Sequence, residues 1–226
     1  MHILILPSSY PSPANQYQGC FVREQALALS KSGLQVGVLA PELHRLRGLS
    51  LRTVFQANRG WSKDGTIHCL RASQVGLPGS WERLRSGQFS VLANRLAIRY
   101  QERFGIPDII HAHDVHHAGF FASKLKQRWE IPSVLTLHNS RWLRESKSQS
   151  INLLKVAIAS ADRVLAVSDF LADAVSRLGN VGQDKIGVLG NLVGPDHPGF
   201  KPPSGPITRW VSIGALKPGK GHELLI

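Results

Sequence analysis

The sequence predicts an α/β protein built on a doubly wound parallel sheet of the Rossmann-like kind. Short apolar, β-branched segments recur along the 226 residues, and segments with helical spacing lie between most of them. Most of the short segments are continuously apolar, which is typical of strands buried on both faces. Strands that alternate with amphipathic helices indicate a parallel sheet with helices on both sides.

The expected strands begin at the N-terminus. The first is stopped by Pro7, so it predicts a strand rather than a signal peptide, and no stretch approaches the roughly 18 apolar residues that span a bilayer. The expected strands are Ile3–Leu6, Gln35–Leu39, Thr66–Leu70, Ile109–His111, Val134–Leu137, Val164–Val167, Ile186–Leu189 and Val211–Ile213.

Apolar stripes with a period of 3.6 residues predict the helices. We expect Ser168 or Asp169 to cap the last of them. The stripes are Val22 with Ala26 and Leu29, then Ala118 to Trp129, then Phe170 to Leu178.

Two segments interrupt the alternation of strands and helices. Residues 41–63 are basic and irregular, and we expect a long loop or a short helix there. Residues 82–104 predict one long helix, with Arg95, Arg99 and Arg103 stacked along one side.

A segment rich in Pro and Gly divides the chain. We predict a Rossmann-like domain at 1–193, a linker at 194–206, and the start of a second domain at 207–226. The last segment offers one strand and about one turn of helix, which cannot bury an apolar face alone. We therefore expect the second domain to be truncated.

Composition narrows the function classes. The net charge of +12 predicts an anionic partner, and the two cysteines lack the spacing of a disulfide framework or zinc site. A nucleic-acid-binding protein is an alternative suggested by charge alone. Aromatic residues make up only 7% of the chain, so stacking platforms are scarce, and we expect no nucleic acid.

The loop after the first strand can bind phosphate. Gly19 stands just ahead of a predicted helix, where backbone N–H groups and the helix dipole favour an anion. A plain strand-to-helix turn is the alternative, since the GxGxxG fingerprint is absent.

Histidines gather where later strands end. Alternation sends His111 and His113 to one side of the sheet, and Asp114, His116 and His117 follow. A metal site is an alternative, but two strand and two helix histidines fit one tetrahedral centre poorly, and we expect none. Hydrogen bonding to a polar substrate is the preferred interpretation.

Two further motifs complete the pattern. His138 follows the next strand and can donate to a sugar hydroxyl or a phosphate, or it is an ordinary, partly buried histidine. Lys217 and Lys220 lie beside glycine after the last strand, a pattern that suits a diphosphate. Ser168 is expected to be a helix cap rather than a ligand.

Taken in order, these features resemble glycosyltransferase family 4, the retaining enzymes of the GT-B fold. The resemblance covers nearly the whole chain. Its segments are Ser8-Ser9-Tyr10-Pro11 to Gly19-Cys20-Phe21, Asp108-Ile109-Ile110-His111-Ala112-His113, Thr136-Leu137-His138, Ala161-Asp162-Arg163-Val164 to Ser168, and Ile213-Gly214 to Ile226.

The resemblance implies two domains facing across a cleft. Gly19 would approach the diphosphate of a nucleotide sugar, Lys220 and Lys217 would neutralise it from the other side, and His138 would lie near the transferred sugar as the catalytic residue. The N-terminal domain would hold the acceptor, and we assign this role to His113, Asp114, Tyr10 and Asn139. No cofactor or metal is then required.

The resemblance also implies partners and a location. The acceptor would be a saccharide or lipid-linked, as in surface polysaccharide synthesis. The protein would be cytoplasmic, with peripheral binding to the anionic inner face of the membrane as part of this expectation. The segments 41–63 and 82–104 would supply the positive charge.

Some positions depart from the family pattern. Gly190-Asn191-Leu192 stands where Pro-Asn-Gly is frequent, Ala215 stands where Arg is frequent, and the paired-glutamate motif that grips the donor is missing. We expect no transfer by this chain alone, and the alternative is a non-catalytic remnant that binds an acceptor or a partner.

Overall fold

The computed structural model describes residues 1–12, 15–44, 60–78, 82–139, 148–179, 181–192 and 205. The chain divides into two compact units, Met1–Val193 and Gly194–Ile226, and the fold described below is that of the first. The strand expected at Val211–Ile213 and the lysines Lys217 and Lys220 lie outside the described residues.

An eight-stranded sheet forms the centre of the unit, in the order β3-β4-β2-β1-β5-β6-β7-β8. All neighbouring strands are parallel except β3 and β4. This confirms the predicted fold class. The strands are β1 His2–Pro7, β2 Gln35–His44, β3 Gly60–Asp64, β4 Ile67–Val75, β5 Ile109–His113, β6 Ser133–Leu137, β7 Arg163–Ala166 and β8 Ile186–Val188.

The expectation for residues 41–63 was wrong at both ends. Strand β2 continues to His44 because it pairs with β4 over its whole second half, and β3 begins at Gly60. The sequence of β3 is polar because it is an edge strand with partly exposed side chains. Its Trp61 packs against Tyr100 and Phe104 of the long helix. Residues 45–59 lie outside the described part of the chain.

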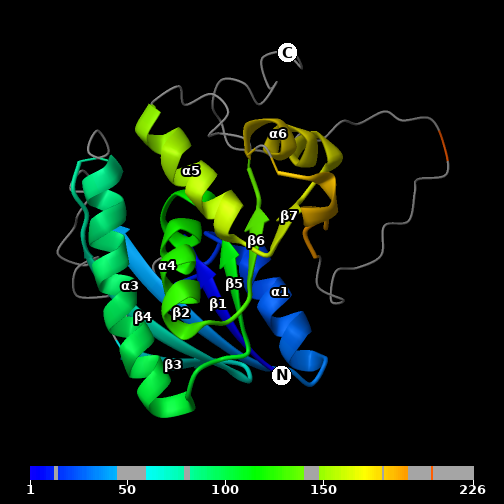
Figure 1. Cartoon of the computed structure of the whole chain (residues 1–226). Helices are drawn as coiled ribbons and strands as arrows, with labels where there is room; N and C mark the ends of the chain where they lie inside the picture. The colour runs from blue at the N-terminus through cyan, green and yellow to red at the C-terminus, as the bar shows by residue number, and fades with distance from the viewer. Residues whose placement is uncertain are drawn as a thin grey trace. The chain divides into compact units, whose positions relative to one another are not determined.

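Helices cover both faces of the sheet (Figure 1). Helix α1 lies on one face, and α3, α4, α5 and α6 cover the other. The long helix expected at 82–104 is confirmed as α3, whereas α5 was not predicted. The helices are α1 Cys20–Lys31, α3 Glu82–Phe104, α4 Phe120–Trp129, α5 Ser148–Ser160 and α6 Asp169–Gly179, with a π-helical turn at Val115–Gly119 and a 3-10 turn at Gln183–Lys185.

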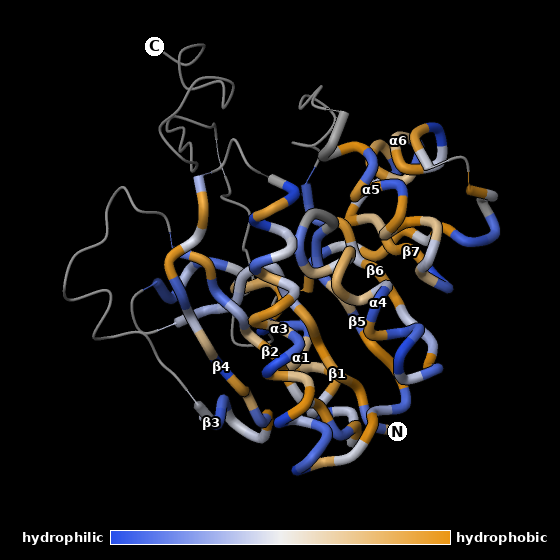
Figure 2. Tube along the Cα trace, turned by 60° about the vertical axis from the view of Figure 1, so that its left-hand side comes forward, coloured by the Kyte–Doolittle hydropathy of each residue, from blue (hydrophilic) through white to orange (hydrophobic). Residues whose placement is uncertain are grey.

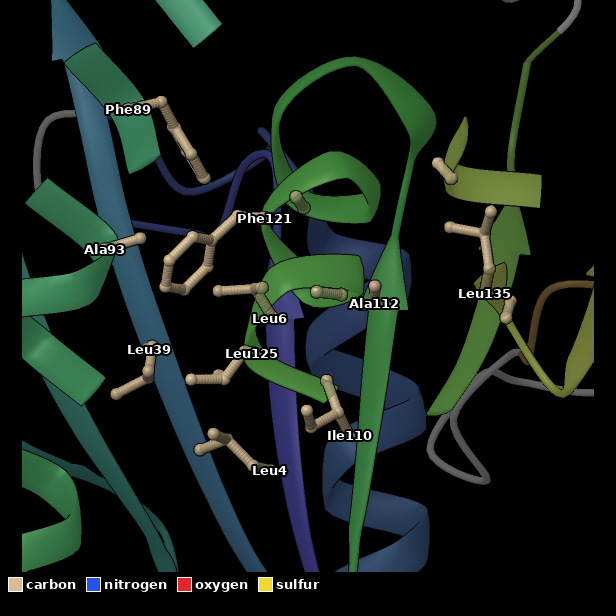
Figure 3. Packing of buried hydrophobic residues seen from close by; sticks show 14 of the residues in the cluster. Leu4, Leu6, Leu39, Phe89, Ala93, Ile110, Ala112, Phe121, Leu125 and Leu135 are labelled. Atoms are coloured by element: carbon tan, nitrogen blue, oxygen red, sulfur yellow. The ribbon is translucent and has the colours of Figure 1, made fainter. Parts of the chain in front are cut away.

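Side-chain alternation along the strands divides the core in two. Leu4 and Leu6 of β1 face the large helical layer, whereas Ile3 and Ile5 face α1. Figure 3 shows Phe121 of α4 packed into the first of these layers. In Figure 2 the central strands are apolar along most of their length, as strands covered on both faces must be.

The order of the strands creates a switch point beside β1. The chain passes from β1 to β2 on one side and later places β5 on the other. Loops that leave the carboxyl ends of β1 and β5 therefore diverge, and in open α/β sheets ligands bind at such a point. These ends lie at the upper edge of the sheet in Figure 1.

Candidate functional site

The N-terminus of α1 lies at the edge of the sheet formed by the carboxyl ends of the strands. Gly19 has φ of +74°, a left-handed conformation that favours glycine. A Cβ at this position would overlap the main-chain oxygen of Ser9 and lie 2.8 Å from its carbonyl carbon. No side chain caps the helix and no acidic residue lies in its first turn, so the helix end presents positive potential to an anion.

His138 lies between two hydrogen-bonding partners at the end of β6. Its Nε2 is 2.9 Å from Nδ1 of His113, and its Nδ1 is 3.0 Å from Oδ1 of Asn191, which follows β8. The ring of Phe21, in the first turn of α1, lies with its centroid 4.2 Å from that of His138. The start of α1 and the ends of β5, β6 and β8, which are far apart in sequence, therefore meet at this edge of the sheet.

The two histidines of β5 lie beneath His138 on the same face of the sheet, as alternation predicted. The ring centroids of His111 and His113 are 4.2 Å apart, and Nε2 of His111 is 2.7 Å from Oγ1 of Thr136. Burial lowers the pKa of His111 to about 4 and holds the pKa of His113 well below its usual range. Both rings are therefore neutral near pH 7.

Asp114 and Asn139 place polar side chains in the loops directly after β5 and β6. The Asn139 amide donates to Oδ1 of Asp114 over 3.1 Å, which links the loops after β5 and β6. Asp114 has φ of +68°, a left-handed conformation that Asp tolerates better than most residues. Its carboxylate favours the protonated form of His138, but burial is the larger effect, and the pKa of His138 is lowered.

Tyr10 lies deeper than the predicted acceptor role requires. Its side chain is 7% exposed, its hydroxyl donates to Asp64 of β3 over 3.0 Å, and the Arg71 guanidinium lies 5.2 Å above its ring. Asp64 also accepts two hydrogen bonds of 2.7 Å from Arg23 of α1. These contacts give Tyr10 a structural role, and its contact with an acceptor stays a prediction.

Ser168 is a cap, as expected. Its Oγ accepts from the backbone N–H of Leu171 over 3.4 Å at the start of α6. In the described part of the chain, no group of three or more His, Cys, Asp or Glu side chains is arranged to hold a metal ion.

Sequence reasoning did not assign Phe21, Thr136 or Asn191 to the site. Phe21 directly follows the glycine and cysteine that open α1, and Thr136 lies two residues before His138, so spacing could have flagged both. Asn191 could not be found this way, because only the tertiary structure brings the end of β8 to His138.

A groove between α3 and α4 lies apart from this edge. Its volume is about 520 Å³, and apolar Val91 and Phe121 line it together with the basic side chains Arg95, Lys124 and Arg128. Leu84, Val91 and Ile98 are exposed at intervals of seven residues and so follow one face of α3. None of the helices in the described ranges combines the length and apolarity that a bilayer crossing demands.

Solved structures identify the class of fold. The similar structures include Arabidopsis thaliana UGT89C1 complexed with UDP, with a TM-score of 0.54, 14% identity, and coverage of 87% of this chain and 53% of that one. UDP-GlcNAc 2-epimerase from Neisseria meningitidis bound to UDP-GlcNAc has a TM-score of 0.53 and 14% identity, covering 84% of this chain and 47% of that one. The enzyme of the same name from Methanocaldococcus jannaschii has a TM-score of 0.52 and 11% identity, covering 84% and 46%. The described fold is therefore that of one GT-B-like domain.

The sequence identifies the family within that class. Residues 19–197 match Glycosyltransferase Family 4, and the chain belongs to this family. It is 29% identical over 191 residues to TuaC of Bacillus subtilis (strain 168), whose name provisionally assigns it to teichuronic acid biosynthesis as a glycosyltransferase. The match covers 79% of this chain and 47% of TuaC, so the chain spans about half the length of this relative.

Proposed function

We propose that this chain is the acceptor-side half of a retaining glycosyltransferase that moves a sugar from a nucleotide-diphosphate sugar to a saccharide or lipid-linked acceptor. Family membership and the name of TuaC support a role in surface polysaccharide synthesis. The observation that carries the proposal is the contact between Phe21 and His138, because it brings an uncapped helix N-terminus beside a polar cluster at the switch point.

Sugar transfer from a nucleotide-diphosphate sugar gives each group of residues at the site a role. The N-terminus of α1 at Gly19 stabilises the charge that develops on the leaving diphosphate, with Lys217 and Lys220 acting from the donor side. His138 lies beside the transferred sugar. His113, Asp114 and Asn139 shape the acceptor side, and Tyr10 supports it from below. Fixed positive charge stabilises the leaving diphosphate, as a metal ion would in other enzymes.

The basic groove between α3 and α4 supports an acceptor that lies at a membrane surface. Val91 lines the groove together with the cations Arg95, Lys124 and Arg128. The exposed apolar side chains of Leu84 and Ile98 follow the same face of α3. Exposed apolar side chains close to cations favour binding to an anionic lipid surface. The apolar side chains enter the interface, and the cations bind the headgroups. We assign peripheral binding at the cytoplasmic face of a membrane to this surface.

Binding without turnover is the alternative function. The described residues would suffice for it, because the polar cluster of His113, His138 and Asn191 is formed within them. In this case the edge would still hold an acceptor or a partner, and the lysines at 217 and 220 would have no catalytic task. The two functions agree on where ligands bind and differ only in whether transfer follows.

A two-part experiment tests the proposal. First, ¹⁵N-labelled chain is titrated with UDP, UDP-glucose and UDP-N-acetylglucosamine, and separately with octyl glycosides. Amide shifts at Gly19 and Phe21 with the first set, and at Asp114 and Asn139 with the second, are expected. Shifts confined to other surfaces would refute the site.

Second, the product of the complete reading frame is incubated with the same donors and acceptors. A glycoside whose anomeric configuration matches that of the donor sugar is expected. Ligand binding without any product would favour the non-catalytic alternative, and an inverted product would refute the retaining reaction.

A further inference from the structure

His138 is held at both ring nitrogens. Nε2 meets Nδ1 of His113 from β5, and Nδ1 meets Oδ1 of Asn191 from the segment after β8. The Phe21 ring covers the imidazole from α1. A ring fixed at two edges and packed against an aromatic side chain cannot rotate without losing these contacts.

The partners determine where the proton lies. Oδ1 of Asn191 can only accept a hydrogen bond, so Nδ1 of His138 must carry the proton. A neutral imidazole has one proton, so Nε2 of His138 accepts, and Nδ1 of His113 donates to it. His113 then has a bare Nε2.

The burial of His113 leads independently to the same tautomer. Its side chain is 0% exposed, and its Nε2 has no hydrogen-bond partner among the described residues. A buried N–H without a partner is rarer in proteins than an under-used acceptor. The bare nitrogen of His113 therefore belongs on the buried side, and its proton belongs on the side of His138.

We propose that His113 and Asn191 are positioning residues that hold His138 as a neutral imidazole with its proton on Nδ1 and its Nε2 as an acceptor. The proposal rests on the proposed function, in which His138 lies beside the transferred sugar. It goes beyond that function by assigning the ring one charge state and one hydrogen-bonding direction.

Protonation of His138 is opposed from several elements. A second proton would direct an N–H at the N–H of His113, and His111 lies next in the same stack. Asp114 favours the charged ring, but the effect of burial on the pKa is larger. Burial therefore keeps the pKa of His138 below its ordinary value, which favours the neutral ring.

This arrangement limits the chemistry of His138. Its N–H is used by Asn191, so the ring has no proton to give to a leaving diphosphate. The lone pair of its Nε2 already accepts from His113, so a sugar hydroxyl that donates to Nε2 must displace or share that hydrogen bond. Compensation of the diphosphate charge is then left to the helix N-terminus at Gly19 and to cations from the donor side.

The tautomers can be read directly by long-range ¹H–¹⁵N correlation NMR on chain labelled with ¹⁵N-histidine, without any ligand. At pH 7 we expect both His113 and His138 to carry the proton on Nδ1. Asn191→Leu should raise the share of the Nε2–H tautomer of His138, although the contact with His113 still favours the Nδ1–H form. Because Asn191 is exposed, this variant leaves the core intact.

Matched variants separate positioning from packing. In His113→Asn the amide Nδ2 can replace the Nδ1 donor, so the His138 tautomer should be retained, whereas His113→Phe should release it. Asn191→Asp should raise the pKa of His138, since a carboxylate replaces a neutral acceptor. His68→Asn on β4 is the control and should change neither ring.

The outcomes are distinguishable from those of the proposed function. An Nε2–H tautomer or an imidazolium at His138 in the wild-type chain would overturn the inference, as would unchanged tautomers in both Asn191→Leu and His113→Phe. In the product of the complete reading frame, Asn191→Leu should reduce turnover about tenfold or more, because His138 is then less well positioned. If the tautomers are as expected but no transfer occurs, the positioning stands and the proposed function fails.

Discussion

The main-chain carbonyl of Ser9 occupies the space into which a side chain on Gly19 would project. The loop after β1 and the first turn of α1 therefore approach each other more closely than any residue but glycine allows. This close approach sets the position of the helix end that we assign to the diphosphate.

Replacing Gly19 with alanine should be strongly destabilising. The left-handed backbone costs about 1–2 kcal/mol for a residue with a Cβ, and displacement of the Ser9 carbonyl adds to this. Urea unfolding measures the change. Gly33→Ala is the matched control, because Gly33 also has positive φ but a Cβ there would meet nothing within 4 Å. Equal losses in the two variants would contradict the close approach.

Replacing His138 with alanine should reduce turnover about 100-fold or more in the product of the complete reading frame, the range for a positioned polar group at a reacting centre. Steady-state kinetics with a nucleotide sugar gives the measurement. His68→Ala serves as the comparison, since His68 lies on β4 beside Phe104. Wild-type kinetics in His138→Ala would remove this residue from the site.

Stability should fall in mild acid because His111 is buried as a neutral ring. Its pKa is about 4 in the folded chain and about 6.5 when unfolded, so between these values the unfolded chain binds more protons. The stabilisation is complete above pH 6.5 and is lost as pH falls towards 4. Unfolding by urea at pH 7 and pH 5 measures the slope. His111→Gln keeps a hydrogen-bonding partner for Thr136 and should reduce the slope, of which buried His113 supplies the rest. An unchanged slope would exclude a contribution from His111.

Tyr10→Phe should destabilise the chain by about 1 kcal/mol, or somewhat more because the lost partner Asp64 is charged. The same variant should bind octyl glycosides as the wild type does if Tyr10 acts only from below. Weakened binding at unchanged stability would instead support the direct acceptor contact that the sequence suggested. Thermal unfolding and NMR titration of the same sample separate these cases.

Removing the basic rim of the α3–α4 groove should weaken binding to anionic vesicles. Each cation near such a surface contributes about 1 kcal/mol, so joint replacement of Arg95, Lys124 and Arg128 by Gln should reduce the partition coefficient about 100-fold. Co-sedimentation with phosphatidylserine-containing and neutral phosphatidylcholine vesicles is the measurement.

The control for this experiment changes the same charge elsewhere, with Lys155, Arg163 and Arg177 replaced by Gln. It should retain most of the binding if position matters, and equal losses would mean that net charge alone acts. If wild-type chain binds neither kind of vesicle, or both equally, the membrane assignment is wrong.

Much of the fold was predictable because buried parallel strands have a local signature. The apolar run at Ile3–Leu6 identifies its strand without knowledge of any neighbour. Strand β3 carries no such signature, since its stability depends on pairing with β4 and on Trp61 packing against α3. Helix α5 was not predicted, although its buried Leu154, Ala157 and Ile158 have helical spacing.

The site was predictable only where it follows strand ends. His113 and His138 were found because the carboxyl ends of parallel strands share one edge. The depth of Tyr10 was not predictable, because it depends on Asp64 of a strand that the sequence did not reveal. Asn191 belongs to a loop whose position depends on the whole order of the sheet.

The double hydrogen bond between Arg23 and Asp64 ties the first turn of α1 to the outermost strand. The backbone amides of that turn are thereby oriented before any anion arrives, so little conformational entropy is lost on association. Affinity at this end of the helix should therefore be limited by charge and fit rather than by ordering, and a small rigid anion such as pyrophosphate should bind it with hardly any change in backbone dynamics.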